Sequence, residues 1–157
     1  MKKFVIYMMT ISVLMTVSCK KEAIPMEDFS VQYIQTNGYI EGRKYPITNV
    51  ISSKNELDRY IKAYENTNDL KEFKDATNVY SNDYFAKSFI VIIMLQEGSG
   101  SIGHKVEKIE TNGDITISRL IPWGQFPVVA AWSIIIELNN SYKARRFHVR
   151  LIDKLLY

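Results

Sequence analysis

The chain has 157 residues, of which 46% are hydrophobic and 24% charged, so it is expected to fold and is neither a disordered chain nor a multispan membrane protein. It is also too short for a kinase or a barrel enzyme. Its 20 basic and 17 acidic residues are scattered along the sequence, and a net charge of +3 gives no reason to expect a nucleic-acid partner.

The amino terminus has the pattern of a bacterial export signal. Lys2 and Lys3 precede a stretch, residues 4–17, that contains no charged side chain. As a helix this stretch would reach about 21 Å, which is less than the hydrocarbon core of a bilayer at about 30 Å. We therefore expect residues 1–18 to be removed as a signal peptide.

The only cysteine of the chain, Cys19, follows Val17 and Ser18, and this segment resembles the lipobox of bacterial lipoproteins. The resemblance implies a diacylglyceryl group on the Cys19 sulfur, with the lipid bilayer as a partner and the cell envelope, outside the cytoplasm, as the location. Residues 19–28 contain Pro25 and show no apolar periodicity, which predicts a linker between the lipid and the fold. A single α+β domain is expected over residues 29–157.

Two strands are predicted at the start of that domain. Residues 30–35 and 45–52 read as extended segments, and they flank the turn signal Asn37-Gly38.

One clear helix follows the second strand. Ser53 and Glu56 have the spacing of a capping box, which predicts the helix start. An amphipathic stripe continues from there at helical spacing: Leu57, Tyr60, Ile61 and Tyr64. Residues 66–68 are expected to end this helix, and a weaker helical pattern covers residues 70–79.

A central strand is predicted next, because residues 89–95 form a continuous, β-branched apolar run typical of a strand buried on both faces. The sequence then reads Gly98-Ser99-Gly100-Ser101-Ile102-Gly103, which has the spacing of a dinucleotide fingerprint. Residues 104–109 read as a strand and not as the helix that such a site needs, so no nucleotide is expected. The loop is either a glycine-rich connection between antiparallel strands, which we favour, or an exposed recognition loop.

His104 follows the glycine loop, and a serine, a histidine and the carboxylate of Glu97 therefore lie within eight residues. Proximity along the chain is not the geometry of a catalytic triad, and no catalytic residue is assigned. The other histidine, His148, alternates with Arg146 and Arg150 and is expected on a solvated face. Two histidines this far apart give no metal-ligand spacing.

The last third of the chain predicts more strands. Asn112-Gly113 signals a hairpin with a type I′ turn. Alternating apolar residues then predict strands at 132–138 and 147–151, with Trp132 in the core. The expected result is a meander-rich antiparallel sheet with one or two helices packed on one face.

Trp123 stands in a loop bracketed by Pro122 and Pro127. A large aromatic residue there either plugs the open end of the core or projects as a contact anchor. We favour the plug, and we keep Trp123 as a candidate contact.

Residues 84–152 resemble the C-terminal domain of the protease-complex subunit PrcB family. The likeness rests on the segment from Glu97 to Val106, on the Asn-Gly hairpin and on the strand that begins at Trp132. In that family an apolar strand leads to a Thr-Gly-Gly-Tyr-Ser-Val stretch and then to a hairpin. Residues 101–106 would occupy that stretch here, and Gly103 and Val106 match it. The resemblance implies a lipid-anchored, non-catalytic accessory that binds a secreted protease through a sheet edge and a loop, without a cofactor.

Three functions follow as hypotheses. The first is an envelope lipoprotein that binds a protein, with the loop Gly98 to His104 and the loop around Trp123 as contacts. The second is a small-ligand module that binds sugar or peptide fragments between Tyr39 and Tyr45. The third is a hydrolase that uses His104.

Overall fold

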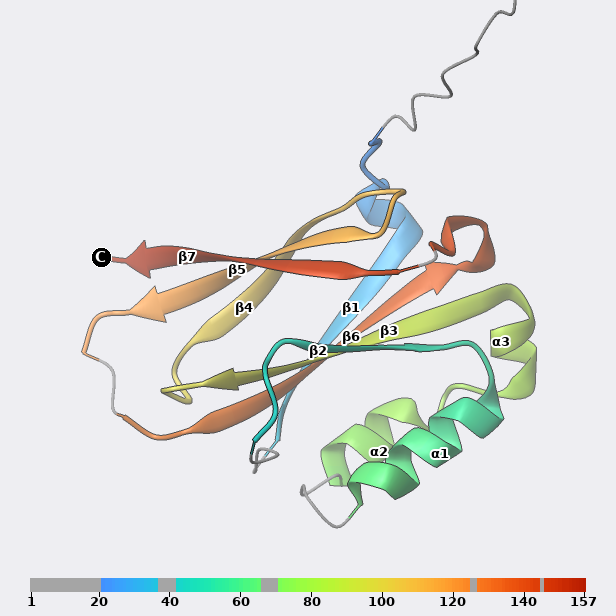
Figure 1. The fold of residues 1–157 in the computed structure, drawn as a ribbon, viewed down its shortest axis with the longest axis horizontal. Coiled ribbons are helices and arrows are strands. Elements are labelled where there is room, and N and C mark those ends of the chain that lie inside the picture. Colours follow the sequence, from blue (N-terminus) through green and yellow to red (C-terminus); the bar gives the residue numbers. More distant parts are fainter. Residues whose placement is uncertain (1–20, 37–41, 66–70, 125–126, 145) are drawn as a thin grey trace, which may run out of the picture.

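The computed structural model describes residues 21–36, 42–65, 71–124, 127–144 and 146–157, which form three stacked layers (Figure 1). A four-stranded sheet in the order β1-β6-β3-β2 packs between a three-stranded sheet, β4-β5-β7, and a layer of helices. The elements in chain order are a 3-10 helix (Met26–Asp28), β1 (Phe29–Thr36), β2 (Ile47–Ile51), α1 (Lys54–Tyr64), α2 (Lys71–Thr77), α3 (Asn82–Lys87), β3 (Ser88–Glu97), β4 (Gly103–Ile109), β5 (Asp114–Pro122), β6 (Ala130–Asn139), a second 3-10 helix (Asn140–Tyr142) and β7 (His148–Leu156).

Strand β3 is buried on both faces, as its continuous apolar sequence predicts. Successive side chains of a strand point to opposite faces, so its residues divide between two cores. The odd-numbered residues pack toward the three-stranded sheet, and the even-numbered ones pack toward the helices: Phe89, Val91, Ile93 and Leu95 on the first face, and Ile90, Ile92 and Met94 on the second. Helices packed on a sheet confirm the α+β class.

The helix predicted from Ser53 is confirmed. The Ser53 hydroxyl accepts a hydrogen bond from the Glu56 amide at 3.2 Å, and the Glu56 carboxylate accepts one from the Ser52 amide at 2.7 Å. The predicted stripe faces the second core. The weaker pattern over 70–79 corresponds to α2, whereas residues 66–70 lie outside the described residues. Helix α3 was not predicted, although Ser81 caps it by accepting from the Tyr84 amide.

The strand connectivity differs from the predicted meander. β1 pairs with β6, and β2 pairs with β3, so the two early strands are not paired with each other. β7 joins β5 in parallel, with Asp114 opposite His148 and Pro122 opposite Leu156. Alternation predicts a strand and its buried face but not its neighbour, because every strand edge offers the same backbone donors and acceptors.

The hairpin between β4 and β5 is present, but its turn is not type I′. A type I′ turn needs a positive φ at both central residues. Gly113 has φ +94°, whereas no non-glycine residue among those described has a positive φ. The Gly113 amide donates to the Glu110 carbonyl, and the Glu110 amide donates to the Asp114 carbonyl. This pattern fits a longer loop with one left-handed glycine.

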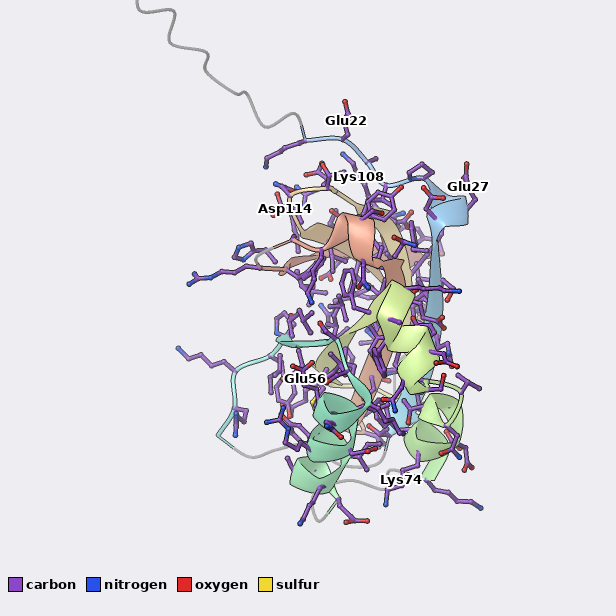
Figure 2. All side chains as sticks on the ribbon, turned by 90° about the vertical axis from the view of Figure 1, so that its right-hand side faces the viewer. Glu22, Glu27, Glu56, Lys74, Lys108 and Asp114 are labelled. Carbon is purple, nitrogen blue, oxygen red and sulfur yellow. The ribbon has the colours of Figure 1, made fainter. Side chains whose placement is uncertain are left out.

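Residues 21–28 are not a free linker, which corrects the prediction for the described part of 19–28. The Thr111 amide donates to the Glu22 carbonyl at 2.9 Å, and the Ile24 amide donates to the Ile109 carbonyl at 2.8 Å. The Ile24 side chain is 4% exposed and belongs to the core between the sheets. Figure 2 shows Glu22 and Asp114 at the end of the molecule where the chain enters. The entering segment is therefore docked on the β4–β5 hairpin.

Candidate functional site

The glycine loop carries the chain from β3 in one sheet to β4 in the other. The Ile102 amide donates to the Ser99 carbonyl at 3.3 Å, which closes a turn. Ser99 and Ile102 are buried, and Gly98 and Ser101 are exposed. A Cβ on Gly100 would lie 2.9 Å from Nε2 of Gln35 and 3.8 Å from Cβ of Ala130, so this loop packs beside the start of β6. The loop joins strands of two different sheets, whereas the sequence predicted a connection between antiparallel strands.

The loop does not assemble a serine–histidine pair. The Ser99 hydroxyl lies 2.7 Å from the Ser101 hydroxyl, and it also accepts from the Ser101 amide at 3.3 Å. The imidazole of His104 instead donates through Nε2 to the Glu97 carboxylate at 2.9 Å. A nucleophile and its base must lie within hydrogen-bond reach, so the hydrolase arrangement considered for His104 is not formed.

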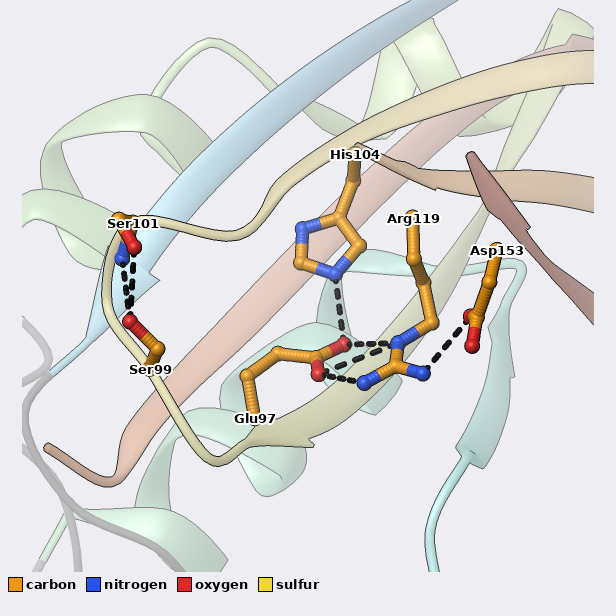
Figure 3. A network of polar contacts seen from close by, with 6 residues as sticks. All are labelled: Glu97, Ser99, Ser101, His104, Arg119 and Asp153. Carbon is orange, nitrogen blue, oxygen red and sulfur yellow. Dashed lines mark hydrogen bonds and ion pairs between the residues drawn. The ribbon is translucent and has the colours of Figure 1, made fainter. Parts of the chain in front are cut away.

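His104 belongs to a different cluster, which ties the two sheets together (Figure 3). Glu97 ends β3, and its carboxylate accepts two hydrogen bonds from Nε of Arg119 on β5, at 3.0 and 3.1 Å, and one from Nη2 at 2.5 Å. Nη1 of Arg119 donates to Asp153 on β7 at 2.8 Å. The cluster Glu97–His104–Arg119–Asp153 thus joins one strand of the four-stranded sheet to all three strands of the other.

The electrostatics of this cluster favour the ionised carboxylate. Burial by itself raises the pKa of Glu97, but the hydrogen bonds from His104 and Arg119 outweigh it and hold that pKa below its ordinary value. In return, the Glu97 carboxylate raises the pKa of Arg119. The Glu97 and His104 side chains are 1% and 0% exposed. Both are closed to a substrate, so the cluster acts as a brace between the sheets.

Trp132 packs against His104 on the side of the brace that faces the core between the sheets. Its ring meets the His104 ring edge-on, with centroids 5.1 Å apart, and it packs against the core between the sheets as predicted. Within the described part of the chain, Nδ1 of His104 and Nε1 of Trp132 are buried without hydrogen-bond partners.

Sequence reasoning missed Arg119 and Asp153, although a signal was present. Arg119 follows Ile115 and Ile117 at the alternating spacing of β5, and Asp153 follows Val149 and Leu151 in the same way on β7. A charged residue on the inward face of a strand indicates a buried partner.

Trp123 does not plug the core, which corrects the favoured prediction. Its side chain is 88% exposed, because it follows the last residue of β5, beyond the edge of the packed layers. Other exposed apolar residues lie at the end of β7 and just before the start of β6. Figure 1 shows these two strand ends on the same side of the molecule as the end of β5. We call this region the apolar end: Trp123, Val128, Val129, Leu155, Leu156 and Tyr157.

The structure brings the two predicted contact loops to the same end of the molecule. Glu97 is opposite Ala130 in the register of β3 and β6, so Gly98 follows β3 where Val129 precedes β6. The exposed Gly98 and Ser101 therefore border the apolar end, whereas the buried Ser99 and His104 lie behind it. Gly103 packs against Leu120 of β5.

The tyrosine pair considered for a small ligand does not form a described site. Tyr45 is partly buried against the core under the helices, and Tyr39 lies outside the described residues. A cleft of about 330 Å³ is present at the hairpin end, but charged residues such as Lys21 and Arg150 line it, and Lys21 pairs with Asp114 at 3.0 Å. His148 is exposed there, as predicted.

No group of three or more metal-ligating side chains occurs among the described residues. In the same part of the chain, no helix combines the length and the apolar composition needed to cross a bilayer. Comparison of the chain with protein-family models, curated protein sequences and solved structures gave no match. The resemblance to the PrcB family therefore stays a prediction.

Proposed function

We propose that this protein is a lipid-anchored accessory of the bacterial cell envelope that binds another protein through its apolar end. The observation that carries the proposal is the exposure of Trp123 within a group of exposed aliphatic and aromatic side chains. Exposed apolar side chains gathered at one end of a domain are typical of protein interfaces. Tryptophan in particular is enriched among residues that dominate binding energy.

The anchor supports this role because of where the chain enters the fold. Cys19 precedes the docked Lys21 by two residues, which span at most about 7 Å. A lipid on Cys19 would therefore hold the β4–β5 hairpin against the bilayer. Trp123 follows the opposite end of β5, and that strand of nine residues is about 26 Å long. The apolar end would point away from the membrane, toward a protein.

The nature of the partner rests on the sequence resemblance. A domain like that of the PrcB family would bind a secreted protease and contribute no catalytic group. The closed environment of His104 and Glu97 supports a binding role for this end of the molecule, since a substrate has no access to either side chain. A protease of the envelope is therefore the proposed partner.

The test is to isolate the protein from native membranes after mild cross-linking, in three forms. The wild-type protein and Val79→Ala should recover the same partner in stoichiometric amount, because Val79 is an exposed apolar residue that follows α2, in the helical layer. The Trp123→Ala protein should recover at least tenfold less of this partner than the wild type does. Repeated recovery of no partner with the wild type, or equal recovery with Trp123→Ala, would overturn the proposal.

The anchor has a separate test. Cys19→Ser should leave the precursor unprocessed and should abolish labelling with a radioactive fatty acid. Labelling of the Cys19→Ser protein equal to that of the wild type would refute lipidation at this residue and leave the binding proposal to its own experiment.

A further inference from the structure

The two sheets have four edge strands, β1, β2, β4 and β7. These edges differ in how accessible their unpaired backbone groups are to an additional strand. β4 has a register shift between Val106 and Lys108, and its Val106 amide donates to the Tyr33 hydroxyl of β1 at 2.8 Å. Ala23 bridges to Glu110 just beyond it. β2 has five residues. These features protect the edges of β4 and β2 from further pairing.

Neither β1 nor β7 has these protections, and of the two only β7 carries charged side chains that can select a partner by charge. The nine residues of β7 pair with β5 without a register shift and contain neither proline nor glycine. Its other backbone edge is unpaired in the described part of the chain. A long, regular edge strand presents a row of amide and carbonyl groups to which another strand can add.

The charged side chains that commonly guard such an edge are turned back over the sheet. Arg150 donates to the hydroxyl of Thr116 on β5 at 3.3 Å, and Lys154 donates to Glu107 on β4 at 2.7 Å. Asp153 accepts from Arg119 in the brace. These side chains are bound to other strands of their own sheet, and no strand of the described chain pairs with the outer backbone edge of β7.

The open edge is continuous with the apolar end. Leu155 and Leu156 are exposed on β7, and the parallel register places Leu156 opposite Pro122. The next residues along the two strands are Tyr157 and Trp123, the two most exposed aromatic side chains of the apolar end. A segment that pairs with β7 would therefore reach apolar contacts at one end of the strand.

Charge indicates the composition of the occupant. The described residues of 143–157 include four basic side chains, Lys143, Arg146, Arg150 and Lys154, and one acidic side chain, Asp153. Such a surface attracts an acidic partner, and it disfavours antiparallel pairing of β7 with a second copy of itself, because like charges would face each other.

We propose that β7 is a docking edge to which an extended, acidic segment with alternating apolar side chains, contributed by the partner protein, adds as a further strand. This inference rests on the proposed function, since it takes the apolar end as the protein-binding end. It adds the edge that is used, the backbone mode of recognition and the chemistry of the segment.

The probe is a pair of fluorescein-labelled nine-residue peptides, one alternating Glu and Val and the other alternating Lys and Val. The purified mature domain should bind the acidic peptide at least tenfold more tightly than the basic one. Binding should also slow amide hydrogen exchange over residues 148–156, because strand addition pairs the free backbone groups of β7. Contact through the Trp123 side chain alone would leave that exchange unchanged.

Charge reversal provides the matched test. The double variant Arg150→Glu/Lys154→Glu should bind the acidic peptide at least tenfold more weakly than the wild type does. It should bind the basic peptide more tightly. The control Lys62→Glu/Lys87→Glu, on exposed positions of α1 and α3, should retain the wild-type preference. If the β7 variant does not fold, the two peptides and hydrogen exchange on the wild type decide the matter.

Three results would overturn the proposal: no saturable binding of the acidic peptide at millimolar concentration, equal binding of both peptides, or dimerisation of the purified domain with protection of β7. Because this experiment uses the domain alone, its failure is separate from that of the proposed function. If Trp123→Ala still prevents partner recovery when the peptides fail, the accessory role stands and the assignment of the edge falls.

Discussion

The buried carboxylate of Glu97 makes the brace between the sheets testable by a one-atom change. Glu97→Gln keeps the size of the side chain but removes the charge that His104 and Arg119 face. Removing one member of a buried ion pair typically costs about 3–5 kcal/mol. The Arg119 side chain is 25% exposed, and it keeps its ion pair with Asp153 in the variant. Water and Asp153 can therefore compensate part of the lost interaction with the Glu97 charge. We expect the free energy of unfolding to fall by about 3 kcal/mol, the lower end of that range.

The pH dependence of the same variant has a definite sign. The pKa of Glu97 is lower in the folded protein than its ordinary value of 4.5. The stability that comes from its ionisation is therefore fully present above about pH 4.5 and is lost as the pH falls through the folded-state pKa. The difference in stability between the wild type and Glu97→Gln should shrink as the pH is lowered from 6 to 3.

The assay is urea unfolding followed by circular dichroism, with Glu107→Gln as the control. Glu107 is a partly exposed carboxylate whose pKa is lowered to about 2, chiefly by the hydrogen bond from Lys154. Exposed ion pairs contribute about 0.2–1 kcal/mol, so this control should lose less than about 1 kcal/mol. An equal loss in the two variants would refute the reasoning that burial makes the Glu97 charge costly to remove.

Further predictions concern the turn, the docked segment and the apolar end. Gly113→Ala should destabilise the domain by more than about 2 kcal/mol, because its φ is +94° and a Cβ would lie 2.1 Å from the Arg146 carbonyl oxygen. Gly98→Ala meets no atom within 4 Å and serves as the control in the same thermal melts. Ile24→Ala should cost about 2–4 kcal/mol in urea unfolding, and a neutral result would contradict the docking of the entering segment. Trp123→Ala should change stability by less than about 0.5 kcal/mol, and a larger loss would mean that Trp123 supports the fold.

The sequence predicted some features of the site, and only the tertiary structure showed the others. The sequence placed Gly98 to His104 at a connection and recognised that a serine, a histidine and a carboxylate were near one another. It did not show that Ser99 would turn to Ser101 and His104 to Glu97, because neighbours in a tight turn can face opposite sides. The partners that define the brace, Arg119 and Asp153, come from strands that join this cluster only through sheet pairing.

The sequence by itself determined the local elements. The apolar run at 89–95, the capping box at Ser53 and the alternation over 132–138 specify their structures through side-chain period and backbone capping, which act over a few residues. Tertiary structure alone decided that β7 pairs in parallel with β5, that residues 21–24 dock on the hairpin and that Trp123 projects into solvent. These outcomes depend on which surfaces meet across long stretches of chain, because backbone edges are chemically alike and only the packing of distant side chains chooses among them.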